Sequence, residues 1–208
     1  MFEKIYSTLK EEKAVAVIRT STYAEAKEIS IAAIKGGMKI IEVTMSVPDA
    51  PKLIKELKEE YKDACVGAGT VLTKDAVDAC IENGAEFIVS PCLDEDVVAY
   101  AIQRKALIMP GLMTMSEINK AHQLGLRFIK IFPGNVVGKG LIGAAKSIFP
   151  DLSIMPTGGV NKENIAEWIK GGADCSGIGS DLNKAYKANG AAGVTEYCAQ
   201  VMKNVKNL

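Results

Sequence analysis

The 208-residue sequence has one histidine and five cysteines, and each scarcity excludes a class of site. A lone histidine, His122, cannot build a His-rich metal site, and a Ser-His-Asp triad would depend on it alone. His122 lies on the helix predicted before the sixth strand, and we expect it to be a surface residue. The cysteines are scattered, odd in number and never spaced as CxxC. We therefore expect reduced thiols and no metal site.

Long apolar runs and an excess of one charge are also missing. No stretch approaches the ~18 apolar residues that cross a bilayer, and Met1 to Lys13 lacks the apolar core of a signal peptide. The 25 basic and 25 acidic residues cancel, without a basic stripe. We expect a cytoplasmic protein whose partners include neither nucleic acid nor a membrane. The length predicts a single domain over residues 1–208.

What the sequence does contain is a repeating pattern of short, β-branched runs. Their ends are 20 to 25 residues apart. The eight runs are Ala14–Arg19, Lys39–Thr44, Cys65–Thr70, Glu86–Ser90, Ala106–Pro110, Arg127–Phe132, Ser153–Pro156 and Cys175–Gly179. Stretches with helical spacing lie between them, such as Ala24–Lys35 and Ala50–Tyr61. Glycines terminate several of these helices, at Gly36-Gly37, Gly84, Gly125 and Gly171-Gly172.

Alternating strands and helices predict a parallel sheet, either an open doubly wound sheet or a closed barrel. Polar residues gather at the carboxyl ends of the runs, where barrel enzymes carry their active sites. This favours an α/β fold of the (β/α)8 TIM-barrel type. Phe2–Glu11 reads as an extra N-terminal amphipathic helix, which we expect to cover the bottom of the barrel.

Nucleotide-binding motifs are incomplete. Gly67-Ala68-Gly69 begins like GxGxxG, but Leu72 stands where the third glycine belongs. There is no GxxxxGK[ST] sequence either. We therefore expect no cofactor.

Two charged residues lie at the centres of apolar runs. Lys130 is flanked by Phe128 and Phe132 on one strand face, and Glu42 shares a face with Ile40 and Thr44. Both runs are even-numbered strands, and alternate strands fill the same layers of a barrel. The two charges are therefore expected to meet inside the barrel, although a strand lysine is often a solvent-facing residue.

The chemistry follows from an amine beside a carboxylate. Desolvation favours the neutral, nucleophilic amine, whereas a nearby carboxylate favours the charged form. A neutral Lys130 can add to a ketone and lose water to form a Schiff base, which accepts electrons from a breaking carbon–carbon bond. Glu42 is the candidate general acid/base.

The ends of other runs supply candidate binding residues. The loops after the seventh and eighth runs fit a phosphate, through the glycines Gly158, Gly159 and Gly179 and the hydroxyl of Ser180. The same loops also fit ordinary tight turns, with Asn161 as an N-cap. Arg19 ends the first run and fits a carboxylate, or is simply a surface arginine. Neighbouring run ends add Thr44, Gly69 and Thr70.

The order of these segments resembles the 2-keto-3-deoxy-6-phosphogluconate / 4-hydroxy-2-oxoglutarate aldolase family. The matching segments are Ile41-Glu42-Val43-Thr44, Gly67-Ala68-Gly69-Thr70-Val71, Ser90-Pro91, Pro110-Gly111, Phe128-Ile129-Lys130-Ile131-Phe132-Pro133 and Pro156-Thr157-Gly158-Gly159-Val160. The resemblance implies a homotrimeric, metal-independent class I aldolase that acts on a phosphorylated 2-keto acid and releases pyruvate. It makes Lys130 the Schiff-base lysine and Glu42 the acid/base, with Thr70 and Gly69 at the pyruvate and Pro91 and Phe132 in the site wall. Gly158, Gly159 and Ser180 resemble the family's phosphate loops.

One position departs from the family. Some members carry an arginine shortly after the glutamate strand, where this sequence has Ser46. Arg19 is the candidate to replace that anionic contact.

The leading hypothesis is cleavage of 2-keto-3-deoxy-6-phosphogluconate to pyruvate and glyceraldehyde 3-phosphate. The alternatives are 4-hydroxy-2-oxoglutarate or the phosphogalactonate isomer as substrate, a phosphosugar isomerase that uses Glu42 as its base, and a non-catalytic assembly subunit. Met45, Met113 and Met115 are candidate surface positions for such an assembly.

Overall fold

The computed structural model describes residues 2–206 and 208. Its eight strands form one parallel sheet in the order β7-β6-β5-β4-β3-β2-β1-β8. A bridge between Thr157 and Gly177 joins the two ends of that order, so the sheet closes into a barrel. The strands are β1 (Ala14–Ile18), β2 (Ile40–Thr44), β3 (Cys65–Gly69), β4 (Ile88–Ser90), β5 (Ile108–Leu112), β6 (Phe128–Ile131), β7 (Ser153–Pro156) and β8 (Ser176–Ile178). The predicted (β/α)8 fold is confirmed.

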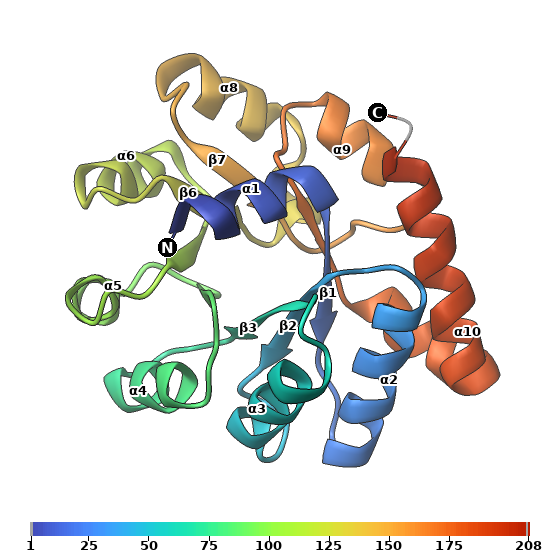
Figure 1. The fold of residues 1–208 in the computed structure, drawn as a ribbon. Helices are drawn as coiled ribbons and strands as arrows, with labels where there is room; N and C mark the ends of the chain where they lie inside the picture. The colour runs from blue at the N-terminus through green and yellow to red at the C-terminus, as the bar shows by residue number, and fades with distance from the viewer. Residues whose placement is uncertain (1, 207) are drawn as a thin grey trace.

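A ring of helices surrounds the barrel (Figure 1). The helices are α1 (Phe2–Glu12), α2 (Tyr23–Lys35), α3 (Ala50–Glu60), α4 (Lys74–Glu82), α5 (Glu95–Gln103), α6 (Met115–Gln123), α7 (Gly134–Val137), α8 (Gly140–Ile148), α9 (Ile165–Lys170) and α10 (Ser180–Lys206). None of the described helices is both long enough and apolar enough to cross a membrane.

Local sequence signals set many of the helix ends. Threonine hydroxyls cap α2, α4 and α6 by accepting a backbone N–H three residues on, at Thr22, Thr73 and Thr114. Glycines with positive φ follow four helices, at Gly37, Gly84, Gly125 and Gly172. Such φ values favour glycine and stop a helix, as the sequence predicts.

The fifth strand is displaced from its predicted range. The sequence predicts Ala106–Pro110, whereas β5 runs from Ile108 through Leu112. Pro110 lacks one ladder donor, but the backbone beyond it pairs with β6, through Gly111 opposite Lys130. A proline therefore does not end this strand, because the partner strand supplies pairing that the local sequence does not reveal.

The alternation of side chains along the strands separates two apolar regions. Residues such as Ile41, Val43 and Ile129 face outward and pack beneath the helices. The other region fills the lower part of the barrel lumen, and its members include Val15, Ile40, Cys65, Phe87, Met109, Phe128 and Cys175. The period of two in strand side chains accounts for this division.

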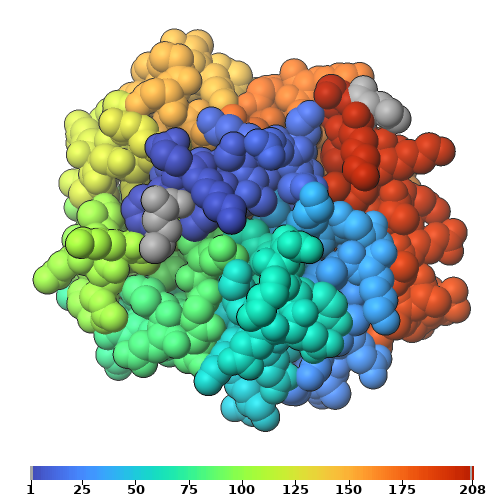
Figure 2. Space-filling view, in the orientation of Figure 1, coloured from blue at the N-terminus to red at the C-terminus, as the bar shows by residue number. Residues whose placement is uncertain are grey.

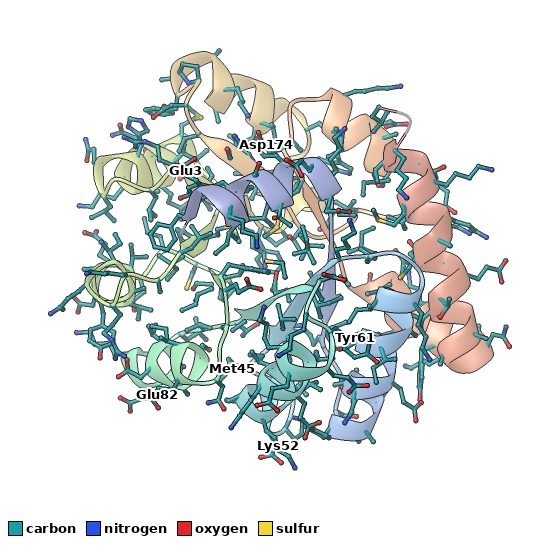
Figure 3. All side chains as sticks on the ribbon, viewed as in Figure 1. Glu3, Met45, Lys52, Tyr61, Glu82 and Asp174 are labelled. Carbon is teal, nitrogen blue, oxygen red and sulfur yellow. The ribbon has the colours of Figure 1, made fainter. Side chains whose placement is uncertain are left out.

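Helix α1 closes the bottom of the lumen, as expected. Ile5 and Leu9 are buried in the lumen cluster, and the Tyr6 ring stacks on Phe128 with centroids 5.6 Å apart. In Figure 2 the side chains of α1 cover the centre of this face. Asp174 lies beside the helix, where its carboxylate is 3.8 Å from Lys10 Nζ (Figure 3). Any site that solvent reaches in the lumen must therefore open at the opposite end.

Candidate active site

Lys130 on β6 and Glu42 on β2 meet inside the barrel. Lys130 Nζ lies 3.9 Å from Glu42 Oε1, and their side chains are 6% and 1% exposed. The position of both residues on even-numbered strands predicts this close approach. Both Glu42 carboxylate oxygens are buried, and within residues 2–206 and 208 neither accepts a hydrogen bond. Buried carboxylates normally accept hydrogen bonds, so the Glu42 carboxylate is free to accept one from a ligand or to take part in proton transfer.

A glycine on the neighbouring strand makes room for that carboxylate. A Cβ atom at Gly69 would overlap Glu42 Oε1 and lie 2.8 Å from the carboxyl carbon. Gly69 therefore supports the site by lacking a side chain. Thr44 is also buried, and its hydroxyl donates to the Ile18 carbonyl over 2.9 Å. Glu42, Thr44 and Gly69 lie behind the cavity wall, so any direct contact with substrate at Thr44 and Gly69 stays a prediction.

A cavity of about 450 Å³ opens at the carboxyl ends of the strands. Lys130 forms part of its wall, and Lys130 Nζ lies 4.9 Å from the centroid of the Phe132 ring. The lining residues are Val17, Arg19, Thr70, Pro91, Lys130, Phe132, Thr157, Gly158, Gly159, Val160, Gly177, Gly179, Ser180 and Asn183. Nine of the predicted site residues are among them, drawn from strand ends and loops far apart in the sequence.

At one side of the cavity, Arg19 is held by hydroxyl groups. Its Nη1 donates to Ser46 Oγ over 3.2 Å and its Nη2 donates to Thr70 Oγ1 over 2.8 Å. Thr70 has φ = 58°, a left-handed conformation that is costly for a β-branched residue. Strained residues cluster at functional sites, and this one places its hydroxyl against the arginine.

At the other side, two glycine loops and a helix end come together. Gly158 and Gly159 have φ values of 98° and 76°, which only glycine adopts at little cost. Their N–H groups donate to no other residue in the described part of the chain. Ser180 opens α10 beside them, so backbone donors, a hydroxyl and a helix N-terminus face the same space. These groups suit a phosphate.

Comparisons with known proteins agree with this geometry. A model of the "KDPG and KHG aldolase" family matches residues 5–196. The chain belongs to this aldolase family. It is 35% identical to a 2-dehydro-3-deoxy-6-phosphogalactonate aldolase of Escherichia coli, over 82% of this chain and 84% of that protein.

Two solved structures of related aldolases superpose on the chain. The 2-keto-3-deoxy-6-phosphogluconate aldolase of Zymomonas mobilis with 3-phosphoglycerate has a TM-score of 0.86 at 29% identity, covering 97% of this chain and 96% of that one. A KDPG aldolase from Legionella pneumophila, with pyruvate captured as a covalent carbinolamine, has a TM-score of 0.85 at 27% identity. It covers 94% of this chain and 97% of that chain. By family, the protein is an aldehyde-lyase.

The aldolase cavity includes residues that the sequence analysis did not select. Thr157 directly follows β7, and its buried hydroxyl has no hydrogen-bond partner among the described residues. Ser153, Met155 and Thr157 occupy every second position and face the lumen. The period of two along a strand therefore predicts that Thr157 points inward. Asn183 lies one helical turn into α10, where no local signal marks it as a lining residue.

The aldolase cavity is not lined by His122, Cys92 or Cys175. His122 on α6 is partly exposed and its Nε2 lies 3.1 Å from Asp151 Oδ1, which supports the predicted surface position. Cys92, next to Pro91, is an exposed free thiol. Cys175 is fully buried in the lumen, and burial, followed by the charges of Asp174 and Glu42, raises the pKa of its thiol well above the usual value.

Proposed function

We propose that this protein is a metal-independent class I aldolase that cleaves 2-keto-3-deoxy-6-phosphogluconate through a Schiff base on Lys130, with Glu42 as general acid/base. The observation that carries the proposal is the buried 3.9 Å approach of Lys130 Nζ to Glu42 Oε1. The carbinolamine captured in the Legionella pneumophila relative supports amine addition as the first step.

The reaction begins when the Lys130 amine adds to the C2 carbonyl of the substrate. The carbinolamine loses water to give an iminium ion, which draws electrons from the C3–C4 bond. Glu42 accepts the C4 hydroxyl proton as that bond breaks, and glyceraldehyde 3-phosphate leaves. The remaining enamine takes a proton at C3, and water hydrolyses the iminium to free pyruvate and the amine.

The anionic ends of the substrate have separate positions in the cavity. The phosphate lies at Gly158, Gly159, Gly179 and Ser180, where backbone donors gather. The carboxylate lies toward Arg19 and Thr70, with Pro91 and Phe132 forming the intervening walls. Thr44 and Gly69 lie behind the cavity wall and support the residues that contact the substrate.

Reduction with borohydride in the presence of pyruvate tests the mechanism. The reductant converts the iminium into a stable secondary amine, and peptide mapping by mass spectrometry should find it on Lys130. An adduct on a different lysine, or no adduct at all, would contradict the proposal. Lys170→Met, on the exposed face of α9, is the matched control that should still trap pyruvate.

The phosphogalactonate isomer is the second candidate substrate, because the 35% identical Escherichia coli relative carries that name. It differs from the first at one stereocentre, and 4-hydroxy-2-oxoglutarate lacks the phosphate. Relative kcat/KM values across the three compounds decide between them. The highest value for 4-hydroxy-2-oxoglutarate would show that the glycine loops do not serve a phosphate.

We also propose that the protein is a single-domain, cytoplasmic homotrimer. Leu72 and Met113, after β3 and β5, are 46% and 41% exposed and offer apolar surface to a neighbouring subunit. Met45 and Met115 pack partly buried against the outer core instead. Light scattering coupled to size exclusion should give three times the chain mass together with activity. A large inactive particle would instead favour the assembly subunit.

A further inference from the structure

Ser46 links Arg19 to Thr44 in a series of hydrogen bonds whose donors and acceptors can be assigned. Thr44 Oγ1 lies 2.9 Å from the Ile18 carbonyl oxygen and 2.8 Å from Ser46 Oγ. A carbonyl oxygen only accepts, so Thr44 donates its single hydrogen to Ile18. Ser46 must then donate to Thr44, which leaves its lone pairs for Arg19 Nη1 at 3.2 Å. The direction of every bond is thereby fixed.

Arg19 is fixed at two further points. Its Nη2 donates to Thr70 Oγ1 over 2.8 Å, and its carbonyl oxygen accepts from Asn183 Nδ2 over 2.8 Å. A guanidinium has five N–H groups, so most of them stay available. Within residues 2–206 and 208, Arg19 forms no ion pair. Its charge is positioned but not neutralised.

Arg19 also borders a second hollow beside the main cavity. This hollow has a volume of about 430 Å³, and its wall includes Ser46, Glu25 and Lys187. An arginine released from its anchors is free to turn toward the Glu25 carboxylate, away from the Schiff-base lysine. The two hydroxyl acceptors oppose that movement because they hold the guanidinium between the hollows.

We infer that Ser46 is a positioning residue that keeps Arg19 directed at the carboxylate of the 2-oxo acid. The inference rests on the proposed function. Because Thr70 accepts from Arg19, its own hydroxyl hydrogen has no acceptor in the described chain and can be donated to the same carboxylate. Arginine, threonine and the serine relay thus form one anion site beside Lys130.

The test measures how pyruvate concentration controls borohydride trapping in Ser46→Ala. Loss of the anchor should raise the half-saturating pyruvate concentration about ten-fold, the effect of one hydrogen bond to a charged group. The trapping rate at saturating pyruvate should not change. Hydroxyacetone, a ketone without a carboxylate, should react as in the wild type. Ser46→Thr keeps the hydroxyl and should restore most of the pyruvate affinity.

Two further variants complete the test. Ser147→Ala, on the outer helix α8, removes a hydroxyl of the same size and should change neither ketone. In an Arg19→Met background, Ser46→Ala should have no additional effect, because both changes act on one contact. Equal losses with pyruvate and hydroxyacetone, or no change with pyruvate, would overturn the role of Ser46. A wild-type protein that traps no pyruvate would overturn the proposed function and this inference together.

Discussion

The lower and upper halves of the barrel lumen are built from the same eight strands but contain opposite kinds of side chain. Below, the apolar cluster that includes Phe87, Met109 and Phe128 also includes Ile5 and Leu9 of α1 and contains no charged side chain. Above, Glu42 and Lys130 face each other beside Gly69. The lower half stabilises the fold, whereas the upper half leaves polar groups unpaired for chemistry, as is general for barrels of this class. Substitutions in each half of the lumen test whether stability and catalysis separate in this way.

The largest effect is expected for Lys130→Met. Removing the nucleophile should lower kcat/KM for cleavage at least about 10⁴-fold. Thermal unfolding at pH 7 should show lower stability, because removing the lysine leaves the buried Glu42 carboxylate without an opposite charge. A steady-state cleavage assay and a melting curve measure both. Equal or greater stability would show that the lysine contributes to catalysis alone and not to the fold.

Phe128→Ala tests the lower half. The ring is fully buried and stacks on Tyr6, so its loss should cost about 3–5 kcal/mol of unfolding free energy. Denaturant titration gives this value. Phe149→Ala, at a partly exposed ring on the outer layer, should cost less. A near-normal kcat in the folded Phe128→Ala protein is expected, and a loss as large as that of Lys130→Met would show that the halves are not separable.

Glu42→Gln should reduce kcat by about 10²- to 10³-fold, because the amide cannot exchange the proton at the C4 hydroxyl. Pyruvate should still be trapped on Lys130, since amine addition precedes carbon–carbon cleavage. Glu82→Gln, at an exposed position on α4, serves as the control (Figure 3). Unchanged cleavage by Glu42→Gln would assign the proton transfer to another group.

Gly69→Ala tests the boundary between the lower and upper halves of the lumen. The new methyl group would overlap the Glu42 carboxylate, so we expect a loss of about 1–3 kcal/mol in stability together with lower kcat. Gly143→Ala is the matched control, because a Cβ there meets nothing within 4 Å on α8. It should stabilise the helix slightly. Normal activity in Gly69→Ala would show that the carboxylate can move without consequence.

Thiol labelling gives the smallest effect and separates the two ends of the barrel. Cys92 is exposed at the upper end, whereas Cys65 and Cys175 lie in the lower lumen. Burial, followed by the charge of Glu86, raises the pKa of Cys65 to about 12, so little reactive thiolate forms at pH 8. Cys198, buried under the outer helices, also has its pKa raised to about 12 by burial. Mass spectrometry after iodoacetamide should find fast labelling at Cys92 alone.

Much of the barrel could be predicted from local patterns. The strand alternation that places Lys130 beside Phe128 is a local property, and the end of α2 at Gly36-Gly37 follows from glycine. The displaced start of β5 could not be predicted, because its pairing with β6 depends on a strand distant in the sequence. Asn183 was missed for the same reason, since α10 reaches the cavity only after the barrel closes.

By itself the sequence determined the number of strand–helix units, the inward direction of Glu42 and Lys130, and the glycines of the phosphate loops. Only the tertiary structure decided the 3.9 Å approach of the two charges and the anchoring of Arg19 by Ser46 and Thr70. The physical reason is that side-chain direction follows from the alternating geometry of one strand. Distances across the lumen depend instead on register and closure of the whole sheet.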